Sequence, residues 1–138
     1  MARMTRFGVS VEKGLLAEFD RLIARRGYPT RCEALRDLMR QALISQAWDE
    51  NVQTAATVTL VYDHNDPGLE AKLTDIQHHF HDNVVAAMHS HLDEHDCLQV
   101  IILKGKAKAI RKMADALISA KGVKHGDIVM TAAGKALP

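Results

Sequence analysis

Apolar and polar positions alternate with a period of two along residues 5–11. This is the period of a β-strand, because successive side chains of a strand point to opposite faces. The pattern predicts a short strand with one apolar face, formed by Phe7, Val9 and Val11. Its other face is formed by Arg6, Gly8 and Ser10.

Helical periodicity follows this strand. Residues 12–26 repeat their apolar positions at helical spacing, and Gly27 is suited to end that helix. Thr30 and Glu33 have the spacing of a Thr-x-x-Glu capping box, which predicts a second helix running to about residue 47. One strand and two helices are too small a unit to bury their own core, and a lone strand needs a partner. We therefore expect this segment to dimerise.

The remaining chain predicts strands and helices in the order βαββαβ. Its strands are expected at residues 56–64, 84–92, 98–104 and 123–131. Its helices are expected at residues 67–81 and between Gly105 and Gly122. This order predicts a ferredoxin-like four-stranded sheet with two helices on one face. We expect an α+β protein with domains at residues 1–48 and 55–138, joined by a polar linker at residues 49–54.

Composition narrows the class of protein. The chain is 47% hydrophobic and 25% charged, which is typical of a soluble globular protein. No run approaches the ~18 apolar residues of a membrane span, and the N-terminus has no apolar signal core. Cys32 and Cys97 are too few for a disulfide framework, so we expect a cytoplasmic protein in which Cys32 is structural.

The distribution of charged residues and histidines along the sequence differs between two parts of the chain. Residues 1–50 hold nine Lys and Arg against seven Asp and Glu, and eight of the nine are Arg. The remainder holds nine basic and ten acidic residues and all eight histidines. An Arg-rich start followed by a His-rich half suggests two functions in one chain.

A candidate metal site lies in the His-rich half. His89 and His91 share one face of a predicted strand, and the turn that follows brings Cys97 back beside them. A thiolate with imidazoles is a donor set for zinc, copper or nickel, and the residues alone do not choose among these metals. We expect solvated or surrounding positions for His79, His81, His95 and His125.

A candidate DNA-binding surface lies at the N-terminus. A ribbon of two antiparallel strands, one from each subunit, fits the DNA major groove. The residues facing the bases would be Arg6, Gly8 and Ser10, preceded by Arg3. The start of the second helix, at Thr30 and Arg31, is suited to hold a phosphate. The same pattern also fits an edge strand and a helical hairpin that serve only dimerisation.

Several segments match a known family in order and spacing. The N-terminal segments are Arg6-Phe7-Gly8-Val9-Ser10-Val11, Leu15-Leu16 and Arg25-Arg26-Gly27-Tyr28. The C-terminal segments are Gln77-His78-His79-Phe80-His81-Asp82, His89-Ser90-His91, Asp96-Cys97-Leu98 and Gly122-Val123-Lys124-His125-Gly126. Together they resemble the nickel-responsive transcriptional regulators. That family joins a ribbon-helix-helix domain to a ferredoxin-like, ACT-type metal-binding domain.

The resemblance implies one nickel ion per subunit in a planar site. The implied ligands are His89, His91 and Cys97 of one subunit and His78 of the facing subunit. It also implies a homotetramer, arranged as a dimer of dimers, whose partner is double-stranded operator DNA. Such a regulator is not an enzyme. It represses or activates genes for nickel uptake or nickel enzymes when it is loaded with metal.

Further residues acquire expected roles through the same resemblance. Glu33 and Asp37 match carboxylates that bind a secondary cation, and Tyr62 and His64 match residues beside the metal.

Two positions depart from the family pattern. Gly8 stands where many members carry a side chain that reads a base, and Gln99 stands where Glu is frequent. Neither departure removes a metal ligand, so we expect them to alter operator choice and metal affinity.

Three other functions fit parts of the pattern. A metalloenzyme could use Asp82 or Glu94 as a base, but it needs an open coordination position and leaves the Arg-rich segment unused. A ribbon-helix-helix regulator could respond to another metal or to a small organic ligand. A metal store would bind the ion without binding DNA. Metal analysis and DNA binding together separate these functions.

Overall fold

The computed structural model describes residues 3–138, which fall into two compact units, one up to Arg40 and the other from Gln41 to Pro138. The first unit contains α1 (Lys13–Arg26) and the start of α2 (Arg31–Asp49). Gly27 ends α1 with φ 79°, and the backbone N–H of Tyr28 donates to the carbonyl of Ile23 at 3.0 Å. The N–H of Glu33 donates to Oγ1 of Thr30 at 3.2 Å, which confirms the predicted start of the second helix.

The predicted strand at residues 5–11 is not formed within this chain. The described residues before α1 have no regular secondary structure, and their apolar side chains do not pack on the helices. Phe7, Val9 and Val11 are 64%, 61% and 44% exposed. The physical reason is that a strand leaves its backbone N–H and C=O groups unpaired until a second strand lies beside it.

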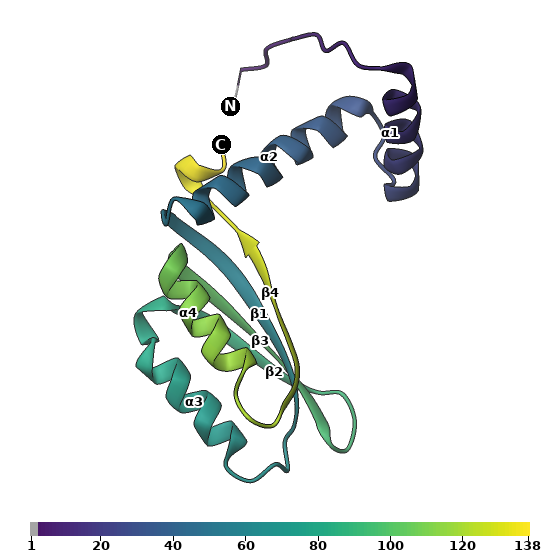
Figure 1. Cartoon of the computed structure of the whole chain (residues 1–138). Helices are drawn as coiled ribbons and strands as arrows, with labels where there is room; N and C mark the ends of the chain where they lie inside the picture. The colour runs from purple at the N-terminus through teal and green to yellow at the C-terminus, as the bar shows by residue number, and fades with distance from the viewer. Residues whose placement is uncertain (1–2) are drawn as a thin grey trace. The chain divides into compact units, whose positions relative to one another are not determined.

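The second unit has the predicted βαββαβ order (Figure 1). Its elements are β1 (Gln53–Asp63), α3 (Leu69–His79), β2 (Val84–His91), β3 (Asp96–Lys106), α4 (Ala107–Ile118) and β4 (Val123–Thr131). The strands form one antiparallel sheet in the order β2-β3-β1-β4. This confirms the α+β class and the ferredoxin-like order of strands.

The connection between α2 and β1 is shorter than the expected linker at residues 49–54. The helix runs to Asp49 and the strand begins at Gln53, so only three residues lie between them. Asn51 turns the chain with φ 54°, and its Oδ1 accepts the backbone N–H of Lys108 at 2.8 Å. The polar residues of this segment therefore hold a tight turn in place.

The core lies between the sheet and α3 and α4. Residues of β1 alternate between buried and half-buried, as expected for a strand with one face on the core. The fully buried face includes Val58, Leu60 and Ile101, and it packs with Leu73 of α3 and Leu117 of α4. The opposite face of the sheet keeps several apolar side chains exposed, among them Met88, Ile102 and Val129.

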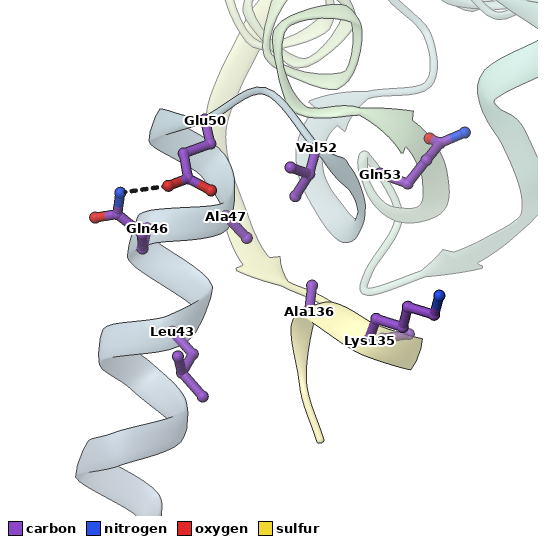
Figure 2. Close-up of a pocket in the computed structure, with 9 residues that line it drawn as sticks. Leu43, Gln46, Ala47, Glu50, Val52, Gln53, Lys135 and Ala136 are labelled. Carbon is purple, nitrogen blue, oxygen red and sulfur yellow. Dashed lines mark hydrogen bonds between the residues drawn. The ribbon is translucent and has the colours of Figure 1, made fainter.

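An open hollow of about 440 Å³ lies beside the last turns of α2 (Figure 2). Its walls are mainly apolar and include Leu43, Ala47 and Ala136, with Gln46 and Glu50 hydrogen-bonded to each other at 2.8 Å. No histidine or cysteine of the described chain lines it, so it is separate from the candidate metal site. Among residues 3–138, no helix combines the length and apolar character that a membrane crossing requires.

Candidate metal centre

The hairpin of β2 and β3 carries the histidine pair and the cysteine. In the strand register His91 lies opposite Cys97, and His89 lies opposite Gln99, so all three candidate ligands share the face that packs on the helices. Oδ1 of Asp93 accepts the backbone N–H groups of His95 and Asp96 at 2.8 and 2.7 Å. These bonds close the turn tightly and fix the register that places the ligands.

Cys97 is at the centre of the site. Its side chain has no exposed surface, and its Sγ lies 3.4 Å from Nδ1 of His91. The rings of His89 and His91 are 5.4 Å apart between centroids. Tyr62, buried on β1, lies opposite Cys97 in the sheet, and its ring centroid is 6.2 Å from that of His89.

Two groups of three donor atoms meet at this thiol. One consists of His64, His91 and Cys97, and the other of Glu70, His89 and Cys97. Within each group the donor atoms lie within 4.8 Å of one another. Such spacing allows a single ion to contact all three atoms of either group after small side-chain movements.

His64 supplies the clearest sign that a binding partner belongs here. It follows β1, and its backbone N–H donates to the carbonyl of His95 at 2.9 Å, which holds it against the hairpin. Its ring meets that of His91 edge-on at 4.9 Å. Nδ1 of His64 is buried and has no hydrogen-bond partner among residues 3–138. A buried nitrogen without a partner costs free energy, and an ion among these donors would remove that cost.

The charges around Cys97 also favour a cation. Burial raises the pKa of the Cys97 thiol, and the nearby carboxylates of Glu70, Asp63 and Asp96 raise it further. Burial, together with Glu70 and Cys97, raises the pKa of Tyr62 to about 12. A thiolate at this position would face several negative groups, so a divalent cation would be strongly stabilised between them.

Glu70 was not predicted as a site residue. It lies in the first turn of α3, and its Oε1 is 3.9 Å from Nε2 of His89. In the sequence, Glu70 is only an acidic residue next to a leucine at the start of a helix, which is a common surface pattern. Only the packing of α3 on the sheet brings this carboxylate to the thiol.

The predicted ligand His78 lies elsewhere in the chain. It is exposed in the last turn of α3 and belongs to neither donor group of the described residues. Four further histidines are exposed and are likewise outside both groups: His79, His81, His95 and His125. Gln99 is half-buried beside His89, in the register described above.

The candidate DNA-binding residues are accessible in the first unit. The exposed set includes Arg3, Arg6, Gly8 and Ser10. Thr30 is exposed at the start of α2, where its Oγ1 caps the helix. Arg31 forms a two-point ion pair with Asp20, at 2.9 and 2.8 Å, which raises the pKa of Arg31 and lowers that of Asp20.

The structure also shows the surroundings of three other residues of this unit. Glu33 pairs with Arg36, and Asp37 accepts the Tyr28 hydroxyl proton. Cys32 is a free, exposed thiol in this chain, and its expected structural role stays a prediction. The second helix begins at Arg31, and its first turn faces solvent at this position.

Comparison with known proteins shows the family of this chain. The family model described as the NikR C terminal nickel binding domain matches residues 55–131. The chain is 51% identical over 138 residues to a Geobacter sulfurreducens protein assigned to the nickel-responsive regulators, with 99% of each chain covered. The chain belongs to the nickel-responsive regulator family. A Thermococcus onnurineus protein assigned to the same regulators is 47% identical over 136 residues, covering 98% of this chain and 99% of its own.

Membership of this family indicates that the regulator binds nickel. The matched family model is that of a nickel-binding domain, and the family is one of regulators, not of enzymes. A solved structure of an uncharacterized Thermotoga maritima protein matches 56% of this chain and 96% of its own, with a TM-score of 0.50 and 15% identity. At this identity the match shows a shared fold alone.

Proposed function

We propose that the regulator binds operator DNA when it carries one nickel ion per subunit, and that it controls genes for nickel uptake or nickel enzymes. The proposed ligands are His89, His91 and Cys97 of one subunit and His78 of the partner subunit. The observation that carries the proposal is the buried Cys97 thiol, 3.4 Å from His91 and beside His89 in one rigid hairpin. Both cysteines are free thiols, which fits a reducing cytoplasm.

The donors fit nickel. Imidazoles suit nickel, and a thiolate with imidazoles is a donor set that it accepts. When bound, the ion supplies a fixed positive charge that offsets the carboxylates around Cys97.

The fourth ligand must come from a second subunit. His78 is eight residues beyond Glu70 on α3, and a helix rises about 1.5 Å per residue, so the two positions are separated by about 12 Å. Since the Glu70 end of α3 lies at the thiol, His78 of the same chain is too far away to reach the site. Its exposure leaves it free to enter the site of a partner subunit.

Exposed apolar surface supports a homotetramer built as a dimer of dimers. In the second unit, the sheet face away from α3 and α4 exposes Met88, Ile102 and Val129. In the first unit, Phe7 and Val9 are exposed before α1. Two separate apolar surfaces allow one dimer contact through the N-terminal strands and another through the sheets.

The N-terminal strands would then form the DNA-reading ribbon. With the apolar residues inside the dimer, Arg6, Gly8 and Ser10 face the major groove and Arg3 reaches the backbone. Thr30 and Arg31 lie at the N-terminus of α2, where free backbone N–H groups attract a phosphate. A phosphate there would compete with Asp20 for Arg31.

The secondary cation expected at Glu33 and Asp37 would have to replace existing contacts. Glu33 would exchange Arg36 for the cation, and Asp37 would exchange the hydroxyl of Tyr28.

Linkage explains how metal could control DNA binding. A site completed by His78 of the partner subunit stabilises the arrangement of subunits in which that histidine is within reach. If this arrangement also holds the ribbons for DNA, the two ligands strengthen each other by the same factor. Tyr62 and His64 lie beside the proposed ligands, with their rings next to those of His89 and His91.

The test compares DNA affinity of apo protein, of protein with one equivalent of nickel per subunit, and of the Cys97→Ala variant, at fixed salt. The panel of DNA should include sequences upstream of nickel-transport and nickel-enzyme genes. We expect tight, sequence-specific binding only with nickel, lost in the variant. The matched control is Cys32→Ala, which removes the exposed thiol and should retain the response. Equal DNA affinity with and without nickel would contradict the proposal.

A further inference from the structure

Positive charge in the second unit is concentrated where β3 leads into α4. Five of the nine Lys and Arg after residue 50 lie within residues 104–112, and no Asp or Glu occurs in residues 97–114. All five side chains are exposed, and we call them the α4 basic patch: Lys104, Lys106, Lys108, Arg111 and Lys112. None of them forms an ion pair within residues 3–138. Unpaired cations at this density attract an anionic partner.

Many carboxylates of this unit lie at the opposite end of the sheet. Gln53 at the start of β1 lies opposite Lys106 of the patch. Asp63 at the end of β1 lies opposite Asp96, and the same end of the unit carries Asp66, Glu70, Asp93 and Glu94. Strand β1 has 11 residues and rises about 3.3 Å per residue, so its two ends are about 33 Å apart. This exceeds the screening length of about 8 Å at physiological salt, so the acidic end does not neutralise the patch.

The α4 basic patch is fixed beside the turn that follows α2. The backbone N–H of Ala107 donates to the carbonyl of Val52 at 3.2 Å, and that of Lys108 donates to Oδ1 of Asn51 at 2.8 Å. These bonds hold the start of α4 at the end of the sheet where α2 leads into β1 (Figure 1). Along the chain, this end is the one joined to the unit that carries the proposed DNA-reading residues.

The side chains of the patch suit phosphate groups. Four of the five are lysines, which act as flexible point charges, whereas reading a base favours the planar fork of arginine. The single arginine, Arg111, already has contacts of its own. Its guanidinium lies 5.7 Å from the centre of the Trp48 ring and donates to Sδ of Met130 at 3.0 Å. The patch therefore fits a phosphate backbone and offers no means of reading base sequence.

We infer that the α4 basic patch binds the phosphate backbone of the DNA that flanks the operator. This inference rests on the proposed function, because it adds a contact from the second unit to the DNA complex formed by the first. Each lysine that neutralises a phosphate releases a condensed counterion, and this contribution to affinity does not depend on base sequence.

The experiment measures DNA affinity of the nickel-loaded, full-length protein between about 50 and 200 mM salt. It uses two duplexes of equal length, one from upstream of a nickel-transport gene and one of unrelated sequence. The variant combines Lys106→Gln, Lys108→Gln and Lys112→Gln and leaves Arg111 with Trp48. Each lost phosphate contact should lower the slope of log affinity against log salt by about 0.9, so we expect a total of about 2.7 on both duplexes. Over this fourfold range of salt, the variant should lose about 40-fold less affinity than the wild-type protein does.

The matched control is Lys72→Gln, compared with Lys112→Gln alone. Each substitution removes one positive charge from an exposed helical position of the same unit, but Lys72 is on α3, outside the patch. We expect the salt slope to change by about 0.9 in Lys112→Gln and to stay unchanged in Lys72→Gln. Urea unfolding and nickel affinity should be the same in the triple variant and the wild-type protein, because all three lysines are exposed.

Three results would overturn the inference. In the first, the triple variant has the salt slope of the wild-type protein. In the second, Lys72→Gln and Lys112→Gln change the slope equally, which would show an effect of net charge alone. In the third, the triple variant loses binding to vesicles of anionic lipid while its DNA binding is unchanged, which would assign the patch to a membrane surface. Failure of the proposed function would instead appear as equal DNA affinity with and without nickel, and the comparison on the unrelated duplex would still read the patch.

Discussion

Nickel binding should release protons, and the largest contribution near neutral pH should come from Cys97. Burial raises the pKa of this thiol, and the carboxylates of Glu70, Asp63, Asp96 and Asp93 raise it further. A cysteine of ordinary pKa, about 8.5, is already only about 3% thiolate at pH 7. With its pKa raised, Cys97 enters the reaction almost entirely as the thiol and must lose one proton for each ion bound.

The size of the pH effect on nickel affinity follows from the loss of this one proton. While the free thiol is protonated and the bound sulfur is not, nickel affinity changes tenfold per pH unit, which is about 30-fold between pH 7.0 and 8.5. The sign is fixed because protons compete with the metal, so affinity rises with pH.

The assay is titration calorimetry in two buffers of equal pH and different ionisation enthalpy, which counts protons released per ion. We expect about one proton from the wild-type protein at pH 7.5 and a smaller number from Cys97→Ala, which retains the imidazoles. Affinity that stays constant from pH 7.0 to 8.5 would refute the reasoning. So would equal proton release by the wild-type protein and the variant, because Cys97 would then not be the source.

Three further outcomes test the fold and the DNA-reading surface. Leu117→Ala removes a fully buried side chain of α4 and should lower the free energy of unfolding by about 2–5 kcal/mol, measured by urea denaturation. Gly122→Ala should cost about 1 kcal/mol or more in the same measurement, because Gly122 has φ 104° and an added methyl group would meet Asp66 and Leu69. Arg6→Ala should weaken specific DNA binding by about 1–3 kcal/mol and leave nickel affinity unchanged, since Arg6 lies in the other unit of the chain.

Periodicity predicted those parts of the fold that one chain completes by itself. The last strand was expected at residues 123–131 and occurs at Val123–Thr131. Strand β1 begins at Gln53, earlier than expected, because its first residues pair with the end of β3 at Lys106. Such pairing depends on the partner strand and leaves no trace in local polarity. The segment at residues 5–11 shows the reverse case, because its pattern is clear but no strand pairs with it among the described residues.

The candidate metal site was predictable where it depended on strand spacing. His89 and His91 share a face because they are two residues apart, and the hairpin turn returns Cys97 to them. His64 was expected near the metal only from family resemblance, and Glu70 was not expected at all. Both reach the thiol through tertiary packing, one from the end of β1 and the other from the start of α3. Spacing along the sequence contains no information about such contacts.

The two ends of α3 lie at different distances from the Cys97 thiol. Glu70 at its start lies at the thiol of its own chain, while His78 near its end lies about 12 Å further along the helix and faces solvent. If His78 is the fourth ligand, as proposed, it must therefore come from a second subunit. Binding of that kind would depend on how the subunits are arranged. The proposed ligand set thus predicts that a nickel ion at Cys97 would favour one arrangement of the subunits over the others.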